Sequence, residues 1–169
     1  MKAISVIGSG TMGNGIAHVF AQHGYKVSLV DISAGQLEKA LSTISKNMDR
    51  QVIKGAISEE DKNQALNRIS TFTTLKEGVE SADLVVEAAT ENMALKLDIF
   101  RQLDQFAPAP AILASNTSSI SITKIAAVTK RPTQVFRGLA RWLRLSLLAH
   151  SHQPKTLGLC PLSEVSECL

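Results

Sequence analysis

The sequence predicts an α/β fold in which helices cover a doubly wound, mainly parallel sheet. Short apolar segments rich in β-branched residues alternate with longer segments whose apolar residues recur at helical spacing. A glycine-rich turn joins the first apolar segment to the first helical one, and an acidic residue ends the second apolar segment. Together these observations indicate a sheet whose strands end at one ligand-binding edge.

The first 30 residues contain a strand, a glycine turn, a helix and a second strand. Residues 2–7 predict the first strand and residues 25–30 predict the second. Gly24 marks the end of the helix between them. The apolar face of that helix is predicted at Met12, Ile16, Val19 and Phe20.

The glycine turn has the spacing of a dinucleotide-binding turn of the Rossmann type. Its first glycine permits a tight turn, its second lets the backbone approach a pyrophosphate, and its third lets helix and strand pack closely. The diphosphate would lie on the unpaired N–H groups at the start of the following helix. A turn with only a packing role would not explain the acid at the end of the second strand. We therefore expect a cofactor against Gly8, Ser9, Gly10, Thr11, Met12 and Gly13.

Asp31, which lies 18 residues after Gly13, predicts which dinucleotide binds. A carboxylate at that strand end accepts hydrogen bonds from the ribose hydroxyls and repels a 2′-phosphate. The next cation along the chain is Lys39. The cofactor is therefore predicted to be NAD and not NADP. In the alternative, Asp31 caps the next helix, a role that Ser33 can also fill.

Two further helices are predicted to form a helical hairpin inserted into the alternating pattern. The first ends before Gly55, and Ser58 and Asp61 have the spacing of a capping box that opens the second, which ends near Asn67. Cations on the polar side of the hairpin either meet an acidic ligand or, as is more common, face solvent. The apolar face comprises Leu37, Leu41, Ile44, Met48 and Val52, and the cations are Lys46, Arg50, Lys54 and Lys62.

Three more strands and one more helix complete the predicted sheet. The strands are expected at residues 69–73, 83–89 and 111–114. Asn92 is expected to cap the helix that lies between the last two strands. The core face of that helix is predicted at Leu95, Ile99, Leu103 and Phe106.

Polar residues follow the last two strands, where an open parallel sheet places its ligands. Thr90, Glu91 and Asn92 follow one strand, with Lys96 one turn into the helix. Residues 115–119 follow the other strand. A helix cap is expected at Ser119 or Ser121, but five consecutive polar residues are more than one cap needs.

Composition limits the class of protein. A chain of 169 residues with 44% apolar content fits one soluble domain without a membrane-spanning run. The net charge of +3 is too small to predict nucleic-acid binding. The two cysteines, Cys160 and Cys168, lie in the last ten residues and do not have metal-site spacing. The cysteine-free body of the chain, with no secretory signal before the first strand, favours the cytoplasm.

Four segments together resemble the NAD-binding domain of the 3-hydroxyacyl-CoA dehydrogenase family, most closely the bacterial 3-hydroxybutyryl-CoA dehydrogenases. They are GSGTMG, Asp31, VEAATENMALK and ILASNTSSISITKIA, and the resemblance covers about residues 1–135. It implies hydride transfer between C3 of an L-3-hydroxyacyl-CoA and NAD⁺ in fatty acid metabolism. It also implies an acyl-CoA substrate and a homodimer formed by a C-terminal helical domain, which has no counterpart in this sequence.

The resemblance assigns roles to matching residues. Gly8, Gly10, Gly13 and Asp31 would hold the pyrophosphate and adenosine side of NAD. Glu91 and Lys96 match positions that contact its nicotinamide half or ribose. Ser118 matches the serine that hydrogen-bonds the substrate hydroxyl, and Asn116 matches a neighbour that lines the pocket.

The chain departs from the family after Phe136. There the family continues into a His-Phe-x-Asn-Pro motif, and the histidine of that motif is the general base. Residues 137–144 of this chain contain no histidine. We expect an NAD-binding domain at residues 1–136 and a divergent, poorly ordered tail at residues 137–169, foreign in origin through a shifted reading frame or an assembly error in a longer enzyme gene. In the alternative, an amphipathic helix that docks a partner or membrane presents Arg137, Arg141 and Arg144 on one face.

Three functions follow. The first is the NAD-binding portion of a 3-hydroxyacyl-CoA dehydrogenase, inactive alone without the histidine. The second is a stand-alone NAD-binding or regulatory module. The third is a different NAD enzyme that uses His18 or His23 as its base, although packing or surface roles are far more common for such helical histidines.

Overall fold

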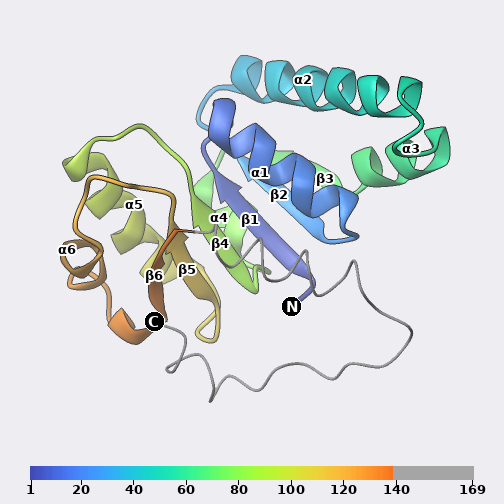
Figure 1. Cartoon of the computed structure of the whole chain (residues 1–169). Helices are drawn as coiled ribbons and strands as arrows, with labels where there is room; N and C mark the ends of the chain where they lie inside the picture. Colours follow the sequence, from blue (N-terminus) through green and yellow to red (C-terminus); the bar gives the residue numbers. More distant parts are fainter. Residues whose placement is uncertain (139–169) are drawn as a thin grey trace. The chain divides into compact units, whose positions relative to one another are not determined.

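The computed structural model of this chain describes residues 1–138. In this part the chain forms a six-stranded sheet whose paired strands are parallel, in the order β3-β2-β1-β4-β5-β6 (Figure 1). The strand order reverses between β1 and β4, so the predicted doubly wound topology is confirmed. The strands are β1 (Ala3–Ile7), β2 (Lys26–Val30), β3 (Ile69–Phe72), β4 (Leu84–Glu87), β5 (Ile112–Ser115) and β6 (Val135–Arg137).

Helices cover both faces of the sheet. The first helix, α1, packs on β1 and β2 and contacts α2 and α3, which form the predicted hairpin (Figure 1). On the other side, α5 contacts both α4 and α6. The helices are α1 (Thr11–Gln22), α2 (Ala34–Ile53), α3 (Glu59–Asn67), α4 (Leu75–Val79), α5 (Met93–Phe106) and α6 (Ile122–Ala126), with a 3₁₀ turn at Pro132–Gln134.

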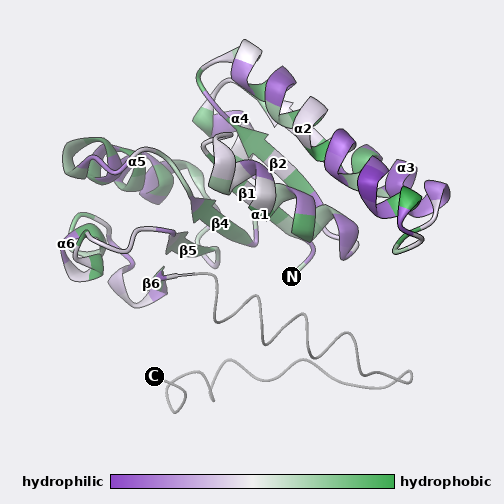
Figure 2. Cartoon of the chain, turned by 45° about the horizontal axis from the view of Figure 1, so that its top comes forward, coloured by the Kyte–Doolittle hydropathy of each residue, from purple (hydrophilic) through white to green (hydrophobic). Residues whose placement is uncertain are grey.

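The core lies between the sheet and these helices. The inner strands are apolar along most of their length, whereas α2 and α3 carry a polar outer side (Figure 2). Every residue of β4 is buried, as the near-continuous apolar run predicts for a central parallel strand. One core cluster joins this strand to α5, β5 and α6 through Val85, Phe100, Leu103, Leu113 and Ile125.

The second helix of the hairpin, α3, begins at the predicted capping box. The hydroxyl of Ser58 accepts a hydrogen bond from the amide of Asp61 at 3.0 Å, and the Asp61 carboxylate accepts one from the amide of Ser58 at 3.0 Å. The ammonium of Lys62 pairs with Asp49 at 2.6 Å and with Glu59 at 2.8 Å. Lys62 therefore has carboxylate partners within the hairpin, which agrees with a charged outer face and not with a site for an acidic ligand.

The predicted apolar faces of two helices are wrong in one position each. Met12 is 57% exposed, because it lies in the first turn of α1, beyond the sheet. Leu95 is 43% exposed, and Lys96 takes its place against the core with 1% exposure. The buried face of α5 therefore comprises Lys96, Ile99, Phe100 and Leu103.

Two local elements differ from the sequence prediction. The helix α4 was not expected, because five residues are too few for an apolar period to stand out. Its Gly78 packs so closely that an added Cβ would lie 2.3 Å from Cγ2 of Val30. Arg137 pairs with Ser115 in β6, so at this residue both the expected tail and the alternative helix are wrong. The remaining expectations for the segment after Gly138 concern Arg141, Arg144, both cysteines and the order of the tail, and lie outside the described residues.

None of the helices within residues 1–138 combines the length and the apolar character that a membrane span needs.

His18 makes the stability of the domain depend on pH. Its side chain is buried, and its Nε2 has no hydrogen-bond partner among the described residues. Burial lowers the pKa of His18 below its ordinary value of 6.5, and a hydrogen bond with Gln22 offsets this only in part. The unfolded chain therefore binds this proton more readily, so the free energy of unfolding should fall as the pH drops below 6.5.

Urea unfolding at pH 7.5 and pH 5.5 measures this effect. The wild-type chain should be less stable at pH 5.5, and His18→Leu should remove most of the difference, because leucine binds no proton. His23→Gln changes the exposed histidine at the C-cap of the same helix and should keep the difference. Equal stability of the wild type at the two pH values would contradict this role of His18.

Candidate functional site

The strand ends that carry the predicted site residues lie side by side at one edge of the sheet. Val30, Ile7, Glu87 and Ser115 are register partners on neighbouring strands. The amide that follows each strand then donates to a carbonyl of the next strand over. These bonds run from Gly8 to Val30 (2.8 Å), from Ala88 to Ile7 (2.8 Å), from Asn116 to Glu87 (2.8 Å) and from Gly138 to Ser115 (2.9 Å).

The glycine turn follows β1 at the point where the strand order reverses. Gly8 has a φ of 98°, and a Cβ there would lie 2.8 Å from the carbonyl oxygen of Ala88. A Cβ on Gly13 would lie 1.7 Å from the carbonyl oxygen of Gly8. Both positions therefore need glycine for the turn itself.

Gly10 differs from the other two glycines of the turn. A Cβ on Gly10 would meet nothing within 4 Å. Gly10 is also the N-cap of α1, and no side chain caps this helix. The first amides of α1 have no partner inside the helix, so they face a space that an anion can enter. The turn thus fits a diphosphate, and Thr11 and Met12, the first residues of α1, are both exposed.

Asp31 is bound to the glycine turn. Its Oδ2 accepts hydrogen bonds from the amide of Ser9 at 2.9 Å and from the hydroxyl of Ser9 at 2.8 Å. Its Oδ1 accepts one from the amide of Ser33 at 3.1 Å. Partial burial raises the pKa of Asp31, but these hydrogen bonds outweigh burial and leave the pKa below its ordinary value of 3.8.

The alternative role of Asp31 as a helix cap belongs to Ser33. Ser33 is the N-cap of α2, and its hydroxyl accepts a hydrogen bond from the amide of Gln36 at 3.4 Å. Asp31 is thereby left as an ionised, partly exposed carboxylate beside the turn.

The loop after β4 and the first turn of α5 bring Glu91 and Lys96 together with Glu87, which the sequence prediction missed. Lys96 is 1% exposed, and its ammonium donates to Oε1 of Glu87 at 2.6 Å and to the carbonyl of Ala89 at 3.1 Å. The nearer oxygen of Glu91 lies 3.9 Å from the same ammonium. Glu91 is 46% exposed, whereas Glu87 is fully buried.

The loop after β5 carries Asn116 and Ser118. Asn116 is half-buried and Ser118 is exposed. The predicted cap at Ser121 lies at the N-cap position of α6 but makes no side-chain cap bond. Arg137 of β6 holds this loop by donating to the carbonyls of Ile120 at 2.9 Å and Ser118 at 3.4 Å.

Glu87 was missing from the predicted site, and Ser115 was predicted only as part of the polar run at residues 115–119, without a partner. The hydroxyl of Ser115 donates to Oε2 of Glu87 at 2.6 Å. A glutamate inside an otherwise apolar strand is a signal for a buried polar contact, because an unpaired carboxylate is costly to bury. Its partner Lys96, nine residues later, could have been found from the same argument.

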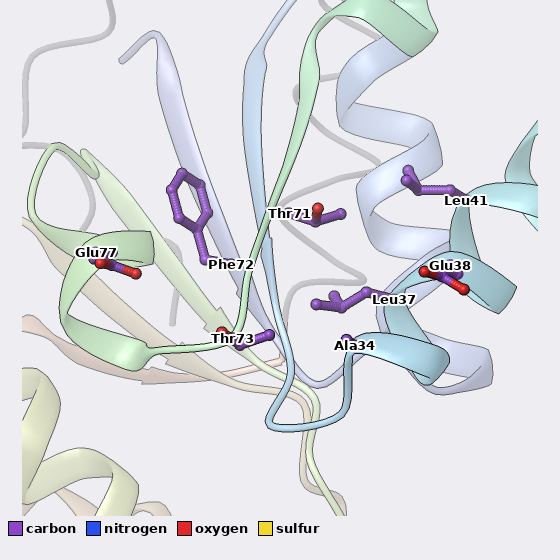
Figure 3. A pocket seen from close by; sticks show the side chains of 8 residues that line it. All are labelled: Ala34, Leu37, Glu38, Leu41, Thr71, Phe72, Thr73 and Glu77. Atoms are coloured by element: carbon purple, nitrogen blue, oxygen red, sulfur yellow. The ribbon is translucent and has the colours of Figure 1, made fainter.

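A hollow of about 260 Å³ lies apart from this edge, between α2 and the outer strand β3 (Figure 3). Leu37 and Leu41 of α2 line it with Phe72 of β3, together with the carboxylates of Glu38 and Glu77. No predicted site residue is among its lining residues. The hollow is therefore not part of the predicted cofactor site.

Comparisons with known proteins agree on one family. The family described as 3-hydroxyacyl-CoA dehydrogenase, NAD binding domain, matches residues 3–139. The chain is 45% identical over 135 residues to a probable 3-hydroxybutyryl-CoA dehydrogenase of Bacillus subtilis, covering 80% of this chain and 47% of the relative. It is 47% identical over 132 residues to the 3-hydroxybutyryl-CoA dehydrogenase of Bradyrhizobium diazoefficiens, covering 78% and 45%.

Solved structures give the same result. The crystal structure of (S)-3-hydroxybutyryl-CoA dehydrogenase from Ralstonia eutropha is similar with a TM-score of 0.78 and 43% identity. The match covers 81% of this chain and 48% of that chain. The chain thus spans about half the length of the proteins that it resembles.

Proposed function

The chain belongs to the 3-hydroxyacyl-CoA dehydrogenase family, whose NAD-binding domain it contains, and we propose that it is the NAD-binding portion of such an enzyme. NAD is the cofactor of this domain family. The proposed substrate class is an L-3-hydroxyacyl-CoA, with 3-hydroxybutyryl-CoA as the first candidate, because relatives with that name are 45% and 47% identical to this chain. We propose that the domain predicted at residues 1–136 extends through β6 to Gly138, because Arg137 pairs with Ser115 in the sheet, and that the sequence after it is a divergent segment.

The observation that carries the proposal is the space at Gly10 beside the uncapped start of α1. We propose that the diphosphate of NAD binds to the backbone of Gly8, Ser9 and Gly10 and to the first turn of α1. Gly13 lets the helix start close enough to the strand for this. Asp31 is proposed to accept hydrogen bonds from the adenosine ribose, since its carboxylate lies at the same turn.

The loops after β4 and β5 are proposed to receive the nicotinamide half and the substrate. Glu91 offers an exposed carboxylate, and the buried ammonium of Lys96, in the first turn of α5, lies 3.9 Å from it. Ser118 is proposed to hydrogen-bond the substrate hydroxyl, with Asn116 beside it. NAD, when bound, supplies the hydride acceptor, while these side chains orient the substrate.

A general base must also remove the proton of the hydroxyl. The sequence after Phe136 does not contain the His-Phe-x-Asn-Pro motif in which the family carries its histidine. We therefore propose that this chain binds NAD but turns over 3-hydroxyacyl-CoA negligibly by itself. The same observation also supports a second candidate function, a stand-alone NAD-binding module without dehydrogenase activity. Oxidation of 3-hydroxybutyryl-CoA by the purified chain would contradict both proposals.

Gly10→Ala is the variant that tests the proposed diphosphate site. The added methyl group has open space in the protein, so the free energy of unfolding should stay within about 1 kcal/mol of the wild type. The same methyl group would occupy the space proposed for the diphosphate, so NADH affinity should fall at least about tenfold. Isothermal titration calorimetry with NADH measures the affinity.

Gly15→Ala is the matched control. It places the same methyl group five residues later, inside α1, again with nothing within 4 Å, and should bind NADH as the wild type does. If the wild-type chain is folded and binds no NADH, or if Gly10→Ala binds it with unchanged affinity, the proposed site is wrong.

A further inference from the structure

Two buried charges lie directly beneath the proposed nicotinamide side of the site. Glu87 and Lys96 are 0% and 1% exposed, and their side chains form an ion pair of 2.6 Å. Such a pair contributes little net stability, because both charges lose their hydration, and apolar residues of similar volume usually do as well. Its presence at the end of β4 and in the first turn of α5 therefore points to a role in the geometry of the site.

The pair belongs to a closed ring of polar contacts that joins the loop after β4 to the loop after β5. Glu87 Oε2 accepts from the hydroxyl of Ser115 at 2.6 Å, and that hydroxyl accepts from the amide of Thr117 at 3.4 Å. The hydroxyl of Thr117 donates to Glu91 at 2.9 Å. Glu91 and Lys96 then close the ring at 3.9 Å.

Glu87 is the residue through which the ring reaches both loops. Its Oε1 accepts from the ammonium of Lys96 and, at 2.7 Å, from the amide of Ala89, so it fixes the backbone of the first loop. Its Oε2 reaches Ser115, where the second loop begins. Glu91, at 46% exposure, is the exposed side chain of the ring and so the one that can meet a ligand.

We propose that Glu87 is a positioning residue, which holds Glu91 and the loop of Asn116 and Ser118 in the arrangement that receives the nicotinamide half of NAD. The inference rests on the proposed function, since it needs the cofactor at this edge of the sheet. Glu87 acts through the ring and does not touch the cofactor, because it is fully buried. The adenosine half, at Gly10 and Asp31, lies outside the ring and does not depend on it.

This division gives a test with two ligands. NADH carries both halves of the cofactor, whereas ADP-ribose lacks nicotinamide but keeps the adenosine and the diphosphate. In the full chain, Glu87→Gln should weaken NADH binding about tenfold, as expected for one lost hydrogen bond to a charged group. It should leave the dissociation constant of ADP-ribose within about twofold. Calorimetry on the two ligands measures both, and hydrogen exchange of the free protein should show faster exchange at the amide of Ala89.

A second variant covers the case in which Glu87→Gln does not fold. Ser115→Ala keeps the ion pair intact and removes the hydroxyl that links Glu87 to the loop after β5, together with its contact to the amide of Thr117. It should show the same pattern, a selective loss of NADH affinity, at several-fold. Glu80→Gln, at an exposed carboxyl group after α4, is the matched control and should bind both ligands as the wild type does.

Each outcome has a definite meaning. A selective loss of NADH affinity in Glu87→Gln or Ser115→Ala supports the positioning role. An equal loss of affinity for both ligands, or unchanged affinity for both, overturns it and leaves the ring with a structural role. If the wild-type chain binds NADH no more tightly than ADP-ribose, the positioning role is also overturned, whereas the proposed diphosphate site is not. A folded wild-type chain that binds neither ligand overturns the proposed function as well.

Discussion

Gly13→Ala is expected to destabilise the domain by at least about 3 kcal/mol and to abolish NADH binding. The added methyl group would lie 1.7 Å from the carbonyl oxygen of Gly8 and 2.8 Å from its carbonyl carbon. Both atoms belong to the backbone, so no side-chain movement relieves the clash, and α1 must shift away from the turn. Because domains of this size are stable by about 5–15 kcal/mol, the loss should be plain in chemical denaturation.

The control for this variant is again Gly15→Ala, which adds the same group two residues later in the same helix. Since a Cβ on Gly15 has nothing within 4 Å and alanine favours helix, this variant should be as stable as the wild type or gain up to about 1 kcal/mol. Wild-type stability for Gly13→Ala would mean that the helix and the turn are not packed as closely as described.

Arg131→Ala is expected to cost about 3 kcal/mol and to lower the melting temperature by roughly 10 °C. The Arg131 guanidinium donates to Oδ1 of Asp104 at 3.0 Å, and both side chains are largely buried. It also donates to carbonyls at the end of α5 and just after it, which have no partner inside the helix. These acceptors are Asp104 (2.9 Å), Ala107 (3.3 Å), Pro108 (2.6 Å) and Ala109 (3.3 Å).

Two variants make this measurement specific. Arg131→Lys keeps the charge but loses the planar fork, so it should be intermediate between alanine and the wild type. Arg101→Ala removes an exposed arginine from α5, the helix whose end Arg131 contacts, and should change the melting temperature by less than about 2 °C. A wild-type melting curve for Arg131→Ala would rule out a capping role for this residue.

The parts of the fold predicted from sequence are those that local residue chemistry determines. The spacing of three glycines after a β-branched strand predicted the turn, because the close approaches at Gly8 and Gly13 exclude any side chain. The capping box at Ser58 and Asp61 predicted the start of α3 to the residue, since both partners lie within one helical turn.

The prediction failed where contacts between residues far apart in the sequence determine which side chains are buried and which side chains pair. Leu95 was assigned to the core by its apolar character, but the buried carboxylate of Glu87 selects Lys96 for that position. The pairing of Ser115 with Glu87, 28 residues apart in sequence, follows from the neighbouring positions of β4 and β5. No local pattern contains that information, so the candidate site was predicted as two separate loops and not as a connected ring.

The two bonds between Ser9 and Asp31 also bear on attempts to change the coenzyme. An engineer who wants the chain to accept a phosphorylated ribose would first remove the negative charge at position 31. In this chain that charge also holds the backbone of Ser9 within the glycine turn. A single exchange at this position therefore alters the proposed ribose contact and the proposed diphosphate-binding turn together, and a successful design needs a replacement donor–acceptor pair at position 9 as well.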